Sequence, residues 1–114
     1  MILKSYGHAT LSLENNEIPY LITDPWLIGS CYWRSWWNYP EVTQDLISSI
    51  NPTHIYLTHL HWDHYHGPSL RKFQNCNPKI LLPKHFNKRM KGDLLKDFNF
   101  SKIIELDHGK KYKL

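Results

Sequence analysis

No apolar run in this sequence is long enough to cross a membrane, and its first residues do not resemble a signal peptide. We therefore expect a cytoplasmic protein that has no membrane partner. Cysteine is scarce: Cys31 and Cys76 are the only two, and they do not form a CxxC pair. In a reducing compartment both are expected to be free thiols rather than partners in a disulfide.

Negative charge is scarce in the second half of the chain. Residues 1–67 carry two basic and six acidic residues, whereas residues 68–114 carry twelve basic and four acidic ones; the whole chain has a net charge of +4. A basic half can face an anionic substrate or a nucleic acid, but these lysines are scattered, which favours a solvated surface. We therefore expect a small-molecule substrate, with nucleic acid as the less favoured partner.

The 114 residues fit a single domain, 1–114, and a hydrophobic fraction of 41% is enough for a core. Apolar runs bounded by turn residues predict strands at 2–6, 9–14, 19–24, 54–58, 79–82 and 102–106, a hairpin turn at 15–17, and a further strand beginning at 111. Helical patterns cover 41–50, 67–73 and one or two segments up to 98, broken near Gly92. This order predicts an α/β (α+β layered) fold with a mixed β-sheet and flanking helices.

Residues 26–40 carry six tryptophans and tyrosines among fifteen residues. Gly29 and Pro40 argue against regular structure there, so the segment is expected to be a long loop. A loop of this composition usually covers a core edge or a pocket. Trp26, Trp36 and Trp37 are the candidates for the wall of a substrate pocket.

The segment 58–67, Thr-His-Leu-His-Trp-Asp-His-Tyr-His-Gly, contains four of the eight histidines of the chain. It follows an apolar strand, so the strand end can direct several side chains toward one point. His59, His61, Asp63 and His64 form the pattern His-x-His-x-Asp-His, and imidazole and carboxylate are common ligands of divalent metals. The alternatives are a closed structural metal site and histidines that cap a helix without metal. The nearby His66 is expected to be a surface residue or a neighbour of the ligands.

Four ligands within six residues are too crowded for one tetrahedral ion. Two adjacent ions fit better, with His59 and His61 on the first and Asp63 and His64 on the second, and each ion then needs further ligands. Two such ions can share a hydroxide that acts as a nucleophile. Zinc is the first choice of metal on this basis, and manganese and iron suit the same ligands.

The pattern at His59–His64 resembles the signature of the metallo-β-lactamase superfamily. Two earlier elements are similar in the same way: Gly7-His8-Ala9-Thr10 resembles a hairpin element of its lactonase-like branch, and the Asp24-Pro25 pair resembles another of its motifs. The stretch from Asp24 to Leu27, with the later Trp36-Trp37 pair, is similar to the corresponding domain of CMP-N-acetylneuraminate hydroxylase-type proteins.

This resemblance implies the first half of an αββα sandwich, that is, a truncated, N-terminal part of a domain about twice as long. It implies a metal-dependent hydrolase in which a metal-bound hydroxide attacks an ester, lactone, amide or phosphoester, and in which Asp63 is the candidate catalytic residue. It also implies that Asp24 orients the motif loop and that His8 lies close to the metals.

Such a half would be weakly active or inactive by itself, because its metal shells are incomplete. One apolar sheet face would also be left bare, which would favour self-association through that face. The alternative function is a non-catalytic module that binds a metal or a protein partner while keeping the first half of the fold.

Overall fold

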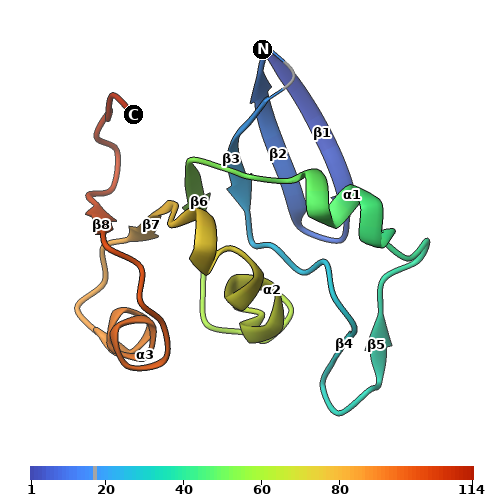
Figure 1. Ribbon diagram of the computed structural model, residues 1–114. Helices are drawn as coiled ribbons and strands as arrows, with labels where there is room; N and C mark the ends of the chain where they lie inside the picture. Colours follow the sequence, from blue (N-terminus) through green and yellow to red (C-terminus); the bar gives the residue numbers. More distant parts are fainter. Residues whose placement is uncertain (17) are drawn as a thin grey trace.

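A six-stranded mixed sheet forms the centre of the computed structural model, which describes residues 1–16 and 18–114; Glu17, in the predicted hairpin turn, lies outside the described residues. The strand order is β1-β2-β3-β6-β7-β8 (Figure 1). The strands are β1 (Ile2–Gly7), β2 (Thr10–Asn15), β3 (Ile18–Thr23), β6 (His54–Tyr56), β7 (Lys79–Pro83) and β8 (Ile103–Leu106). The first three strands pair antiparallel, and β3, β6, β7 and β8 pair parallel. The predicted mixed sheet is therefore confirmed.

In the part of the chain that the structure describes, three helices connect the parallel strands, as crossover connections require. The helices are α1 (Gln44–Ser49), α2 (Gly67–Lys72) and α3 (Arg89–Asp97), and a short 3₁₀ turn, Gln74–Cys76, follows α2. Helix α1 begins at Thr43, whose hydroxyl accepts a hydrogen bond from the Leu46 amide. Helix α2 has Pro68 in its first turn, where a missing amide hydrogen costs nothing.

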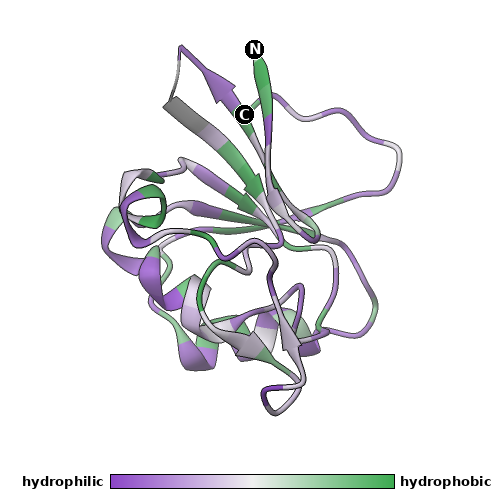
Figure 2. Ribbon diagram, turned by 90° about the vertical axis from the view of Figure 1, so that its right-hand side faces the viewer, coloured by the Kyte–Doolittle hydropathy of each residue, from purple (hydrophilic) through white to green (hydrophobic). Residues whose placement is uncertain are grey.

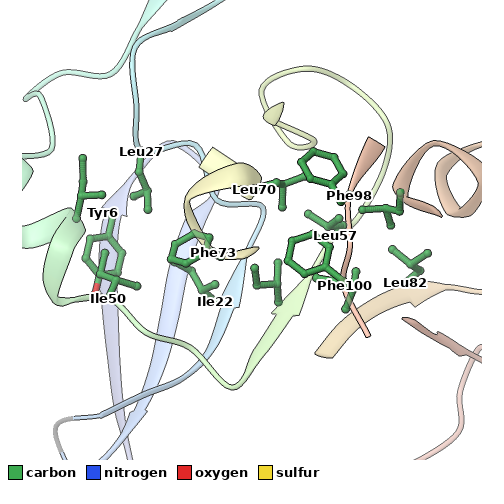
Figure 3. Packing of buried hydrophobic residues seen from close by; sticks show 14 of the residues in the cluster. Tyr6, Ile22, Leu27, Ile50, Leu57, Leu70, Phe73, Leu82, Phe98 and Phe100 are labelled. Atoms are coloured by element: carbon green, nitrogen blue, oxygen red, sulfur yellow. The ribbon is translucent and has the colours of Figure 1, made fainter. Parts of the chain in front are cut away.

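The main core lies between one face of the sheet and these helices (Figure 3). Ile22, Ile55 and Ile80 are paired in register on neighbouring strands, so their side chains form one continuous row. All three are fully buried against Leu70 and Phe73 of the α2 region. This packing fixes the ends of β3 and β6, from which the functional residues project.

The opposite sheet face carries a second apolar row. Leu21 pairs with Leu13, and Leu81 pairs with Ile104, but none of these residues belongs to the core cluster on the helix side. Figure 2 shows that several strands of the main sheet are hydrophobic over part of their length. On β1, Leu3 is 64% exposed. The expectation that this face supports self-association stays a prediction.

Three details of the predicted secondary structure are wrong. The aromatic segment is not an irregular loop throughout, because β4 (Ser30–Cys31) and β5 (Trp36–Trp37) form a small antiparallel ribbon away from the main sheet (Figure 1). Helix α3 is not broken at Gly92, whose amide donates to the Lys88 carbonyl within a helix anchored by buried Leu94. The last residues, 111–114, are described and form no strand.

No helix in the described part of the chain combines the length and apolar character needed to cross a bilayer.

Candidate metal centre

The motif segment leaves the sheet at the carboxyl end of β6. Hydrogen bonds join its start to the neighbouring strands: the Leu57 amide donates to the Leu81 carbonyl, and the Asp24 amide donates to the Tyr56 carbonyl. A tight turn then follows, in which the amides of His64 and Tyr65 both donate to the His61 carbonyl. This turn brings the two halves of the motif back toward each other.

Asp24, at the end of β3, holds this segment in place from the adjacent strand. Its Oδ1 accepts a hydrogen bond from the Thr58 amide at 2.8 Å, and its Oδ2 accepts one from the Thr58 hydroxyl at 2.7 Å. The same Oδ2 lies 2.8 Å from Nδ1 of His64. The carboxylate is almost fully buried, with 2% of the residue exposed, and the backbone at Asp24 has a φ of +36°. A side chain with all these partners is fixed in one orientation.

These contacts determine which nitrogen of each ring carries its proton. His64 donates from Nδ1 to Asp24, which leaves its Nε2 as the ligand atom. The Thr58 hydroxyl donates to Asp24, so it accepts from Nδ1 of His59, 2.8 Å away, and Nε2 of His59 is also left as a ligand atom. Burial and the neighbouring His64 and His61 lower the pKa of His59, which favours the neutral form that binds metals.

The rings of His59, His61 and His64 lie close together. Nε2 of His59 and Nδ1 of His61 are 3.0 Å apart, and the rings of His59 and His64 have centroids 4.1 Å apart. Ligands at about 2.1 Å from one ion lie roughly 3.0–3.4 Å from each other in octahedral or tetrahedral geometry. The separation of His59 and His61 therefore fits a shared metal.

Asp63 faces the second half of the cluster. Its Oδ2 lies 2.7 Å from Nε2 of His8 and 3.2 Å from Nε2 of His64, while its Oδ1 accepts a hydrogen bond from the Tyr32 hydroxyl at 2.7 Å. Burial alone would raise the pKa of Asp63, but the hydrogen bonds from Tyr32 and His8 lower it to about 2. The group is therefore a carboxylate at neutral pH.

His8, Asp63 and His64 together form a group that can hold a metal ion, with one ligand atom from each lying within 4.8 Å of the others. Two lone pairs, on Oδ2 of Asp63 and Nε2 of His64, face each other across 3.2 Å. Such a pair requires a cation between them, either a proton or a metal ion. The donor set and its spacing thus support a metal cofactor.

The structure places the predicted pocket residues beside this cluster. Trp26, Trp36 and Trp37 line a cleft of about 450 Å³ together with His8. Trp26 is buried, and its indole ring stands edge-on to the ring of His8 at 5.2 Å, whereas Trp36 and Trp37 are about half exposed. The predicted metal ligands and pocket residues stay predictions as to their roles.

Two features of the site were not predicted, and the surface position that was one alternative for His66 is wrong. Tyr32 lies 31 residues before Asp63 in the sequence, and no spacing pattern links the two. Thr58 stands directly before the first motif histidine, which is a local signal that could have indicated its role. His66 is not a surface residue, since it is 5% exposed and its ring joins the Ser69 hydroxyl to the Ser30 carbonyl.

The fold of this chain is similar to that of part of a solved structure, although no protein-family model matches it. The solved structure of CmlA, a diiron β-hydroxylase from Streptomyces venezuelae, superposes on 97% of this chain and 21% of its own, with a TM-score of 0.69 and 22% sequence identity. The chain therefore shares the fold of part of that protein.

The proteins that are similar to this chain in sequence are much longer than the chain itself. The cytidine monophosphate-N-acetylneuraminic acid hydroxylase of Asterias rubens is 34% identical over 76 residues, which cover 66% of this chain and 12% of that protein. A putative Rieske 2Fe-2S iron–sulfur protein of Mycolicibacterium smegmatis is 31% identical over 88 residues, which cover 75% of this chain and 16% of that protein. The chain thus spans less than a fifth of the length of these relatives.

These findings overturn the assignment to the metallo-β-lactamase superfamily. The similar proteins are named as hydroxylases, a diiron enzyme and an iron–sulfur protein. The predicted hydrolase, the half sandwich of that superfamily and the preference for zinc are therefore wrong, and the alternative of a non-catalytic binding module fits no better. The physical reason is that a His-x-His-x-Asp-His pattern specifies ligand atoms, and the same atoms serve iron as well as zinc.

Proposed function

We propose that this chain forms the metal-binding part of an iron-dependent hydroxylase. The observation that carries the proposal is the close placement of two pairs of ligand atoms, Nε2 of His59 with Nδ1 of His61 and Oδ2 of Asp63 with Nε2 of His64. Thr58 and Asp24 fix the ring tautomers of His59 and His64. The names of the similar proteins support iron and hydroxylation as the chemistry.

Direct ligation of iron by histidine and aspartate suits the site better than a Rieske cluster does. A Rieske cluster is held by two cysteines and two histidines. Cys31 is buried in β4, where its thiol donates to the Trp62 carbonyl, and Cys76 is exposed after α2. Neither cysteine lies in the segment 58–67 or in the group of His8, Asp63 and His64.

Two iron ions match the arrangement of the ligands. His59 and His61 form one pair at 3.0 Å, and Asp63 and His64 form a second pair at 3.2 Å, with His8 beside it. Each ion would take further ligands from water, substrate or other protein segments. When bound, the iron would supply the activation of dioxygen.

The residues of this chain would position and shield the centre. Asp24 and Thr58 orient the ligand rings, as outer-shell partners of metal-bound histidines usually do. The cleft lined by Trp26, Trp36 and Trp37 would admit a small-molecule substrate next to His8. The proposed compartment is the cytoplasm, where the free thiols of Cys31 and Cys76 would stay reduced.

Anaerobic reconstitution with Fe(II), followed by measurement of bound iron, tests this proposal. The double variant His59→Ala/His61→Ala should lose at least one of the ions that the unmodified chain retains. The matched control is His85→Ala/His108→Ala, since both of these histidines are exposed and lie outside the cluster. Equal iron in the unmodified chain and the motif variant would reject the site.

A further inference from the structure

We propose that Tyr32 is a positioning residue for the metal ligand Asp63, an inference that rests on the proposed iron site. Its hydroxyl holds Oδ1 of the carboxylate, so that Asp63 offers only Oδ2 to the metal. The role assigned to Tyr32 is therefore to fix the binding mode of one ligand without being a ligand itself.

The two oxygens of Asp63 have different surroundings. Oδ1 accepts a hydrogen bond of 2.7 Å from the Tyr32 hydroxyl. Oδ2 points to the ring nitrogens of His8 and His64, which belong to the potential ligand group. A carboxylate can bind a metal through one oxygen or both, and a strong donor on one oxygen selects the single-oxygen mode.

The β4–β5 ribbon holds the phenol ring rigidly. Tyr32, Trp33 and Arg34 are consecutive residues with φ of +50°, +53° and +68°, a left-handed run that bulky side chains rarely adopt. The Cys31–Trp36 pair of the ribbon and a hydrogen bond from the Ser35 amide to the Tyr32 carbonyl close this turn. A conformation of this kind persists only where the surrounding structure enforces it.

Aromatic contacts fix the direction in which Tyr32 points. Its ring stacks on Trp62 of the motif, with centroids 5.6 Å apart, and stands edge-on to Trp36 at 4.8 Å. The thiol of Cys31 donates to the Trp62 carbonyl, so two adjacent residues of the ribbon bind two adjacent residues of the motif. The ribbon therefore holds Trp62 and Asp63 in fixed positions through these two hydrogen bonds.

The test is Tyr32→Phe in the full chain, which removes one oxygen and keeps the ring. Loss of the donor leaves Asp63 without its fixed orientation, so Fe(II) affinity measured anaerobically against a competing chelator should fall by about 10–100-fold, as for other outer-shell partners. The visible spectrum of the Co(II)-loaded chain should also change, because the carboxylate can then bind through both oxygens. The matched control is Tyr39→Phe, a ring that is 97% exposed, and it should behave as the unmodified chain does.

Circular dichroism and thermal unfolding of the metal-free variants show whether each one is folded. If Tyr32→Phe does not fold, Trp36→Leu loosens the same phenol without removing it and should weaken Fe(II) binding in the same direction. Equal affinity and an unchanged Co(II) spectrum in Tyr32→Phe, or in Trp36→Leu where that variant replaces it, would overturn the inference. A phenolate-to-iron charge-transfer band in the Fe(III)-loaded chain that Tyr32→Phe abolishes would also overturn it, because Tyr32 would then be a ligand.

Iron binding by the unmodified chain and by Tyr32→Phe tests the iron site and the role of Tyr32 separately. An unmodified chain that binds no iron rejects the iron site itself. An unmodified chain that binds iron, together with a Tyr32→Phe chain that binds it equally, rejects only the role of Tyr32.

Discussion

Oδ2 of Asp24 lies 2.8 Å from Nδ1 of His64, although forty residues separate them in the sequence. The contact joins the end of β3 to the turn that follows β6, two strands that are neighbours in the sheet. It also fixes the His64 tautomer so that Nε2 faces Asp63. The position of a proposed metal ligand thus depends directly on the parallel pairing of β3 with β6.

The substitution Asp24→Asn should weaken metal binding by about 10–100-fold, which is the usual effect of losing an outer-shell partner. The amide group presents a donor where His64 also donates, so the His64 ring should change its tautomer or rotate. Nitrogen NMR of the imidazole rings detects the tautomer, and chelator competition measures the affinity. Asp45→Asn, at an exposed position in α1, is the control and should change neither quantity.

Thr58→Val should weaken metal binding by about tenfold, because His59 loses the acceptor for its Nδ1 proton. Thr58→Ser keeps the hydroxyl and should restore most of the affinity. The comparison is made by chelator competition on the two variants. Equal affinity of the valine and serine variants would show that the hydroxyl does not set the His59 tautomer.

The stability of the metal-free chain should depend on Asp63 in a defined pH range. Its pKa is lowered in the folded state from 3.8 to about 2, so its charged form stabilises the fold above pH 3.8, and this contribution is lost as the pH falls toward 2. Asp63→Asn lacks the contribution at all pH values. Urea unfolding at a series of pH values should therefore show a difference in the free energy of unfolding between the two chains at pH 5. This difference should become smaller as the pH falls toward 2.

Asp97→Asn, at an exposed position near the end of α3, is the control for that experiment. It should follow the unmodified chain throughout. A gap between the unmodified chain and Asp63→Asn that stays constant over the whole range would contradict the lowered pKa.

The packing of α2 on the sheet should be a major source of stability. Leu70 is fully buried in the core cluster, and Leu70→Ala should reduce the free energy of unfolding by about 2–5 kcal/mol. Leu95→Ala, at a position that is 63% exposed in α3, should change it by less than about 0.5 kcal/mol. Denaturant unfolding measures both, and a small effect of Leu70→Ala would show that α2 is not anchored as described.

The sequence predicted the parts of the structure that depend on local patterns. Most strands and the segment 58–67 have strong periodic or compositional signals, and the mixed sheet followed from their order. Gly92 was misjudged as a helix break, because its helix-weakening effect of about 1 kcal/mol is outweighed by the packing of Leu94. Tyr32 could not be predicted, since its role arises from a left-handed turn and a tertiary contact.

The sequence could not specify the chemistry of the site either. Histidine and aspartate at this spacing indicate a metal but not the reaction, because the metal and the surrounding protein determine what the ligands support. The prediction of a zinc hydrolase followed from the ligand pattern and its resemblance to the metallo-β-lactamase superfamily, and the comparison with longer relatives corrected it.

The most direct test of the central claim is anomalous X-ray diffraction at the iron absorption edge, from crystals of the chain loaded with Fe(II) without oxygen. We predict anomalous density at two positions, one within bonding distance of Nε2 of His59 and Nδ1 of His61 and one within bonding distance of Oδ2 of Asp63 and Nε2 of His64, with the His64 ring still hydrogen-bonded to Asp24. Iron density located only at exposed histidines such as His85 and His108, or absent from the 58–67 turn, would contradict the account.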